Sequence, residues 1–446
     1  MTPNNQGRIG KVIEFTFLGI SYLALLGALI FGVWNIGHRF NPDFRSPFDE
    51  HTHFDYWWKI YHEHRLPEVY EKIDKASLHI WGCKDRENPL RKNACVVSEQ
   101  GPSVHENTAS NYPPTFYIAS AGMAALINWF HPTQDLFHLA KYSTLAWGIL
   151  CLFALAVTSA TLGIPPLINA ILVFAIAQTP AFVFAAITFN QEIFVLLCSL
   201  VGLILYTRLQ TLNKTAIFAI AGGLFSAFCL SVKPTAMLIP VMIVMAEGLA
   251  THRPFKMRLR RVVSFSAVSL GAYVLFTNAV NAFRGINPSD GKMQEYLIRL
   301  GEGTDRSWTT QAEMVWVHFT RSTGSLNWRA LVDWGLPWLF PYFHQFLLAM
   351  LVAATVVVLV MWRLRTEPLL SARLLVGCMA AFVALPLTLA LYLSTGDFPF
   401  FFQPRYFTAY IIVGVIAGAA LLTDLLRLSV AGLKERFITY GKSHEA

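Results

Sequence analysis

The sequence predicts an all-α fold, a polytopic bundle of about 10 or 11 transmembrane helices. Of its 446 residues, 54% are hydrophobic and only 14% are charged, whereas soluble domains carry about 25% charged residues. The apolar residues fall in blocks of about 18 to 25, long enough to cross a hydrocarbon layer of about 30 Å. Basic residues gather in short segments between the blocks. These features exclude a disordered chain, a disulfide-rich scaffold and a collagen-like repeat.

The first elements are predicted to be a polar arm at 1–12, on the inside of the membrane, and a span at 13–34. Because no small-x-small site follows this long apolar run, we interpret it as a retained span rather than a cleaved signal peptide. Residues 35–111 then form a long outer loop, and 283–336 a second one. The whole of 1–446 is predicted to be a single membrane domain. The further apolar blocks are 112–130, 139–162, 165–187, 190–207, 215–232, 234–250, 262–282, 337–362, 371–393 and 406–426.

The net charge of +8 indicates membrane topology rather than nucleic-acid binding. The loop at 35–111 holds 10 basic and 12 acidic residues, a net charge of −2, so the rest of the chain carries +10. Short basic segments mark the cytoplasmic side of a membrane and also attract anionic lipid headgroups. The segments that carry this signal are 208–214, 251–261, 363–365 and the carboxyl tail.

The basic segments and the number of apolar blocks disagree in one part of the chain. Counting back from the basic segments places Asn190 outside, whereas counting forward from the amino terminus ends block 112–130 inside. We therefore expect 139–162 or 165–187 to enter and return, or to lie partly in the interface. Pro165-Pro166 would permit such a break. The alternative is that the charge rule fails locally.

The cysteines fall into two groups. Cys83 and Cys95 lie in the first outer loop, where an oxidising compartment would favour a disulfide between them. Two free thiols are the alternative. The others lie in apolar blocks and are interpreted as small packing residues: Cys151, Cys198, Cys229 and Cys378.

No metal site is predicted. His51, His53 and the run His62-Glu63-His64 are ligand types that zinc accepts, but their spacing matches no zinc-binding pattern. No cofactor is required. A loosely bound divalent cation on Asp49 or Glu50 stays open.

The most charged stretch follows the first span and runs from Pro47 to Trp58. If Asp49 starts a helix, its carboxylate suits the positive end of the helix dipole, and Asp49, His53 and Trp57 share one face. A carboxylate held there, Asp49 or Glu50, can act as a general base. The alternative is an acidic helix cap exposed to solvent.

Other polar motifs lie where apolar blocks begin or end, and each also has a structural explanation. Tyr112 precedes Pro113-Pro114, and Asn190 is a candidate cap. Lys233 would reach the interface by snorkelling. Gln403, Arg405 and Tyr406 precede the last span as candidate interface anchors. All of them fall on the predicted outer face, together with the acidic pair, and Arg and Lys are the side chains that bind phosphate.

At these residues the chain resembles the GT-C superfamily of integral-membrane glycosyltransferases. It is most similar to an uncharacterised bacterial membrane-protein family with the motif Pro-Pro-Asp-Glu-Pro-x-His-Phe. The matching segments are Pro47-Phe48-Asp49-Glu50-His51-Thr52-His53-Phe54, Pro113-Pro114-Thr115-Phe116-Tyr117, Phe189-Asn190-Gln191, Val232-Lys233-Pro234-Thr235, Ser325-Leu326-Asn327-Trp328 with Asp333-Trp334-Gly335, and Gln403-Pro404-Arg405-Tyr406-Phe407. Gln191 stands where an acid is usual in the family, and Glu192 is a candidate substitute.

The resemblance implies a GT-C-like architecture and sugar transfer from a polyprenyl-phosphate donor to a glycan or protein acceptor. The site would face the periplasm from a bacterial inner (cytoplasmic) membrane. In an inverting reaction, Asp49 or Glu50 would be the general base, and Arg405 and Lys233 would bind the donor phosphate. The other predicted substrate-binding residues are His53, Tyr56, Trp57, Tyr112, Asn190, Gln403 and Tyr406. Packing is the alternative for the aromatic residues Tyr56, Trp57 and Trp58.

Two rival functions remain. A flippase or transporter of a lipid-linked glycan would place charges at the membrane midplane in two related halves, and Glu247 is one of few charges deep in an apolar block. An outer-face polysaccharide ligase or polymerase would use a donor that carries a glycan chain. The second outer loop, with Trp308, Trp316, Trp328 and Trp334, is the expected acceptor-binding surface.

Overall fold

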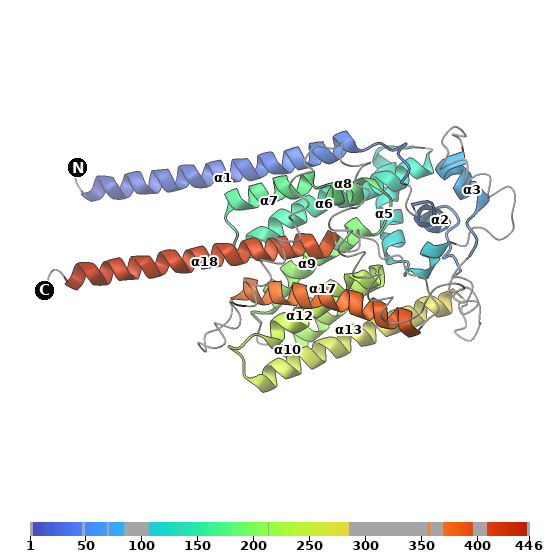
Figure 1. Cartoon of the computed structure of the whole chain (residues 1–446). Coiled ribbons are helices and arrows are strands. Elements are labelled where there is room, and N and C mark those ends of the chain that lie inside the picture. Colours follow the sequence, from blue (N-terminus) through green and yellow to red (C-terminus); the bar gives the residue numbers. More distant parts are fainter. Residues whose placement is uncertain are drawn as a thin grey trace.

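The structure is a bundle of helices, most of which lie side by side (Figure 1). The computed structural model describes residues 3–46, 50–68, 71–83, 107–133, 135–212, 214–284, 356, 369–395 and 408–443. Helix α1 (Pro3–Arg39) begins and α18 (Thr408–Ser443) ends at one end of the bundle. Helices α2 (Glu50–Tyr61) and α3 (Lys75–Leu78) lie at the other end. We call these the terminal end and the α2 end.

The remaining described helices run between these elements. They are η1 (His79–Cys83), η2 (Thr108–Asn111), α5 (Thr115–Phe130), α6 (Leu136–Thr161), α7 (Pro166–Gln178), α8 (Pro180–Ile187), α9 (Glu192–Leu209), α10 (Thr215–Ile217), η3 (Phe218–Gly222), α11 (Gly223–Val232), η4 (Pro234–Met237), α12 (Leu238–Gly248), α13 (Phe255–Phe283) and α17 (Leu370–Thr395).

The predicted class, a polytopic all-α bundle, is confirmed. Among the described residues, six helices are long and apolar enough to cross a membrane, or up to seven if α7 and α8 form one bent span. The expected total of about 10 or 11 spans stays a prediction, because most of block 337–362 lies outside the described residues.

Helix α5 contradicts the expectation that block 112–130 crosses the membrane. Just before α5, the Tyr112 carbonyl accepts a hydrogen bond from the Tyr56 hydroxyl of α2, at 3.3 Å. Just after it, Lys141 near the start of α6 pairs with Glu50 of α2, at 3.1 Å. Both ends of α5 therefore connect to the α2 end. Its 16 residues, about 24 Å of helix, turn back instead of carrying the chain to the terminal end.

The returning segment is therefore 112–130, not one of the two blocks after it. Helix α6 is itself a candidate span. Helices α7 and α8 meet at a bend of 65°, at Thr179 and Pro180 rather than at the expected Pro165-Pro166. Pro166 occupies the first turn of α7, where its missing N–H is not needed, whereas Pro180 interrupts an apolar run that otherwise continues.

Small residues let the helices pack closely. A Cβ at Gly148 of α6 would lie 2.7 Å from Ala186 of α8, and one at Gly377 of α17 would lie 2.7 Å from the Met242 carbonyl oxygen of α12. The four cysteines in apolar blocks are buried, which confirms their packing role. Cys95 of the predicted disulfide lies outside the described residues.

The basic segments meet at the terminal end, where arginines bind helix carboxyl termini. Arg253 and Arg261 pair with Glu247, at 3.1 and 2.6 Å. Arg261 also donates to the carbonyl of Leu209 at the end of α9, and Arg373 to that of Ala246 in the last turn of α12. Cations at these positions offset the negative end of the helix dipole. Glu247 therefore lies at a helix end rather than midway along its helix.

We predict that both ends of α5 are accessible from the same side of the membrane. In a chain whose native cysteines are replaced, Glu68→Cys and Pro132→Cys should react with a membrane-impermeant maleimide in the same preparation, either intact cells or inverted vesicles. Lys256→Cys, at the start of α13, should react in the other preparation. Labelling of Pro132→Cys together with Lys256→Cys would show that α5 crosses.

Candidate functional site

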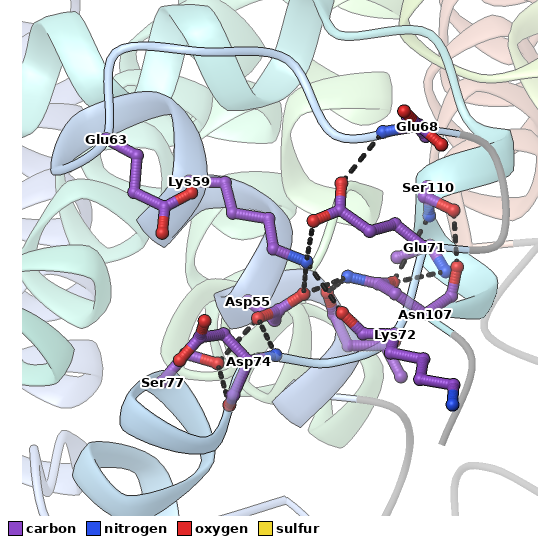
Figure 2. A network of polar contacts seen from close by, with 12 residues as sticks. Asp55, Lys59, Glu63, Glu68, Glu71, Lys72, Asp74, Ser77, Asn107 and Ser110 are labelled. Atoms are coloured by element: carbon purple, nitrogen blue, oxygen red, sulfur yellow. Dashed lines mark hydrogen bonds and ion pairs between the residues drawn. The ribbon is translucent and has the colours of Figure 1, made fainter. Parts of the chain in front are cut away.

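Helix α2 is fixed to the rest of its loop by the buried carboxylate of Asp55 (Figure 2). One oxygen accepts hydrogen bonds from the Asp74 amide at 2.9 Å and the Ser77 hydroxyl at 2.6 Å. The other accepts from Lys59 at 2.9 Å and the Asn107 amide at 2.7 Å. With both oxygens occupied, Asp55 is a structural anchor that joins three separate loop segments to α2.

A second acid extends this network towards solvent. Lys59 also lies 3.2 Å from Glu71, which accepts two hydrogen bonds from Arg65, at 2.7 and 2.8 Å. Burial raises the pKa of Glu71, but the Arg65 hydrogen bonds and the charge of Lys59 outweigh it and lower the pKa to about 2. Because this pKa is depressed, the network stabilises the fold near neutral pH and weakens as pH falls from about 4.5 towards 2.

Glu50, one of the two predicted bases, has both carboxylate oxygens engaged. One accepts from the Ser46 amide at 2.7 Å. The other accepts from the Phe189 amide at 2.6 Å and from Lys141 of α6 at 3.1 Å. The side chains of Glu50 and Lys141 are 1% and 0% exposed. Glu50 therefore connects α2 to α6 and to the segment between α8 and α9, and neither oxygen is open to a substrate.

His53, on the next turn of α2, begins a polar chain that runs into the bundle. Its Nδ1 lies 2.7 Å from the Tyr117 hydroxyl of α5. That hydroxyl also accepts a hydrogen bond from the Gln191 side-chain amide, at 3.0 Å. All three side chains are buried. The motifs around His53, Pro113-Pro114 and Asn190 are therefore in contact.

Lys233 reaches the same region and is paired rather than snorkelling. Its ammonium lies 2.5 Å from Glu192, the first residue of α9, and 5.3 Å from the centre of the Tyr112 ring. The Tyr112 ring in turn stacks at 6.0 Å from His53. Asn190 caps α9, because its side-chain oxygen accepts from the Glu192 amide at 2.9 Å. The capping alternative for Asn190 is therefore correct.

Tyr56 and Trp57 lie in the protein interior, both 0% exposed. Tyr56 stacks on Tyr117 at 3.9 Å between ring centres, and Trp57 stacks on Tyr61 at 4.7 Å. No face of either ring is open to a sugar, so the packing alternative holds. It is packing within the protein rather than against the bilayer surface.

The structure thus brings together Glu50, His53, Tyr112, Asn190 and Lys233 among the predicted residues. The others, Asp49, Gln403, Arg405 and Tyr406, lie outside the described residues, as does the predicted acceptor surface after Arg284. The start of α18, however, reaches the Lys233 segment, because the Tyr410 hydroxyl donates to the Thr235 carbonyl at 2.7 Å.

Several residues of the site were not predicted. The clearest signal was available for Lys141, the only basic residue in block 139–162. Arg284 ends a long apolar block and donates to the Ser110 carbonyl at 2.9 Å and to the Tyr56 hydroxyl. Tyr117 belongs to a motif that was noted, but its contacts depend on the fold.

In the part of the chain that is described, no three His, Cys, Asp or Glu side chains are grouped so that they could hold a metal ion. A scan against protein-family models finds no match to this chain, and a search of curated proteins finds none either.

We predict that Glu50→Gln lowers the free energy of unfolding by about 3–5 kcal/mol, because it leaves the buried Lys141 ammonium without its counter-ion. Lys141→Met should destabilise similarly, and the double variant should be more stable than either single variant. Unfolding of the purified protein in detergent, followed by circular dichroism, measures this.

Asp43→Asn is the matched control for this cycle, since the Asp43 side chain is 77% exposed and its pairing with His138 contributes little. Destabilisations that simply add in the Glu50/Lys141 double variant would show that the pair is not coupled.

Proposed function

We propose that the protein transfers a sugar from a polyprenyl-phosphate donor to an acceptor hydroxyl, at the α2 end of the bundle. The observation that carries this proposal is the convergence at that end of an acidic helix start, a histidine, an amide and a lysine. They come from α2, from the segment before α9 and from the segment before α12. Such a set suits an uncharged hydroxyl nucleophile and an anionic leaving group.

The sidedness of the proposed reaction follows from charge. The basic segments lie at the terminal end, which the positive-inside rule assigns to the cytoplasm. The α2 end then faces the outside of the bacterial inner membrane. Nucleotide sugars are confined to the cytoplasm, so a transferase that works outside needs a donor carried in the membrane. A lipid phosphate meets that requirement.

For the general base we favour Asp49 over its neighbour Glu50. Both Glu50 oxygens already accept hydrogen bonds, so Glu50 serves to position the start of α2. In the proposed step, Asp49 takes the proton of the acceptor hydroxyl as that oxygen bonds to the anomeric carbon. The bond between the anomeric carbon and the donor phosphate oxygen breaks, and its electron pair stays on the lipid phosphate.

Lys233, together with Arg405, would stabilise the charge that develops on that phosphate. The contact with Glu192 holds the Lys233 ammonium in place and gives its burial a counter-ion. Because the Glu192 carboxylate is engaged in this way, we assign it to orienting Lys233 rather than to replacing the missing acid at Gln191.

The flippase alternative gains no support from the described ion pairs. The charged residue that favoured it, Glu247, pairs with arginines in the last turn of α12, at the terminal end. The buried pairs of Glu50 and Glu192 lie with α2 and the first turn of α9. A polysaccharide ligase would use the same outer site with a longer glycan on the donor, so the donor's glycan decides between it and the transferase.

We predict that Asp49→Asn slows the reaction about 10²- to 10⁴-fold without loss of fold, as expected for removal of a general base. The purified protein is supplied with membranes as acceptor and with undecaprenyl phosphate linked to glucose, mannose, galactose or arabinose. Release of undecaprenyl phosphate is measured by mass spectrometry, which detects transfer whichever sugar is used.

Asp43→Asn, an exposed acid on the same loop, is the control and should keep the wild-type rate. Unchanged release by Asp49→Asn and by the Asp49→Asn/Glu50→Gln double variant would refute the assigned base. Transport of the donor across sealed vesicles without any glycoside formed would favour the flippase.

A further inference from the structure

The Gln191 side chain has an amide oxygen for which the protein provides no hydrogen-bond partner. The side chain is 0% exposed, and its nitrogen donates to the Tyr117 hydroxyl at 3.0 Å. Leaving a buried acceptor unpaired costs about 1–3 kcal/mol. A group retained at that cost, beside the lysine proposed to bind phosphate, is a candidate for binding a hydrogen-bond donor from a ligand.

The amide is held in place by a rigid arrangement. Because Tyr117 accepts from Gln191, its own hydroxyl hydrogen is directed at His53 Nδ1, at 2.7 Å. The Tyr117 ring is packed between Tyr56, at 3.9 Å, and His53, at 6.0 Å between ring centres. Little side-chain freedom remains to be lost when a ligand binds, which favours binding by a preorganised group.

The position of Gln191 selects the part of the donor that it would contact. The next residue, Glu192, pairs with Lys233 at 2.5 Å. In a polyprenyl-phosphate donor the sugar is bonded directly to a phosphate oxygen, so groups beside the phosphate-binding lysine are placed for the sugar. Tyr112, which contacts both His53 and Lys233, is partly exposed, so this cluster lies one side chain below the surface.

Resting on the proposed function, we propose that Gln191 binds a hydroxyl of the transferred sugar through its amide oxygen and that Tyr117 is the positioning residue for this contact. A site built to accept a hydrogen bond from a sugar hydroxyl rejects a donor that lacks it, since the buried oxygen then stays unpaired. Gln191 is thus a determinant of which sugar is transferred.

The test compares two lipids, undecaprenyl phosphate and the same lipid linked to a sugar, the best bound of the glucose, mannose, galactose and arabinose forms. Affinities are measured by native mass spectrometry on the purified protein in nanodiscs. Gln191→Met keeps the side-chain length but removes both polar groups. It should weaken binding of the sugar-linked lipid about threefold to tenfold, the effect of one lost neutral hydrogen bond, and leave undecaprenyl phosphate unchanged.

Tyr117→Phe should shift the same preference in the same direction, because it releases the Gln191 amide while keeping the packed ring. The matched control is Asn169→Leu. Asn169 is buried in α7, donates to the Ala156 carbonyl at 2.8 Å and also has an unpaired amide oxygen, but it lies away from the site. This variant should keep the wild-type preference.

The outcomes separate the inference from the proposed function. If the wild type prefers the sugar-linked lipid and Gln191→Met and Tyr117→Phe keep that preference, the inference is wrong and the proposed function stands. Loss of preference in Asn169→Leu as well would show a general effect of destabilisation, which also overturns the inference. If the wild type binds neither lipid, the proposed function fails, and the inference with it.

Discussion

The carboxylate of Glu50 is the contact on which the arrangement of the site depends. It accepts hydrogen bonds from an amide just before α2, from an amide between α8 and α9, and from Lys141 of α6. A buried charge without these partners would be strongly unfavourable, so the three segments are held together at one point. His53 lies one turn further along α2 and is thereby placed against Tyr117 and Gln191.

The same rule governs the other buried charges that are described. Asp55 is paired with Lys59, Glu192 with Lys233, and Glu247 with two arginines. The pairs of Glu50 and Glu192 join residues 91 and 41 positions apart. In a chain with only 14% charged residues, these charges do more than set topology. They connect helix ends that have little other polar surface, and they gather the candidate chemistry at the α2 end.

The sequence was sufficient for the fold class, because blocks of apolar residues and the basic segments between them determine a helical bundle. The path of α5 was not predictable in this way. An apolar run of 16 residues is compatible with a span or with a returning arm, and the contacts that decide, from Tyr56 to Tyr112 and from Lys141 to Glu50, are long-range. The bend at Pro180 depends likewise on which proline falls inside a helix.

For the candidate site, the sequence predicted that polar motifs converge but not how each residue is used. Glu50 and Asn190 proved to hold structure together, and Tyr56 and Trp57 are packed in the interior. Tyr117 and Lys141 acquire their importance from partners 64 and 91 residues away, which no local pattern shows. A buried acid with two free oxygens and one with none look the same in a sequence.

Hydrogen exchange of the Glu50→Ala variant, followed by mass spectrometry, tests most directly whether Glu50 anchors the site. Removal of all three contacts should speed exchange in α2 and in the segment from Thr188 to Val195, while α13 (Phe255–Phe283) exchanges at the wild-type rate. Unchanged exchange in both segments would contradict the account, because α2 would then be held without Glu50.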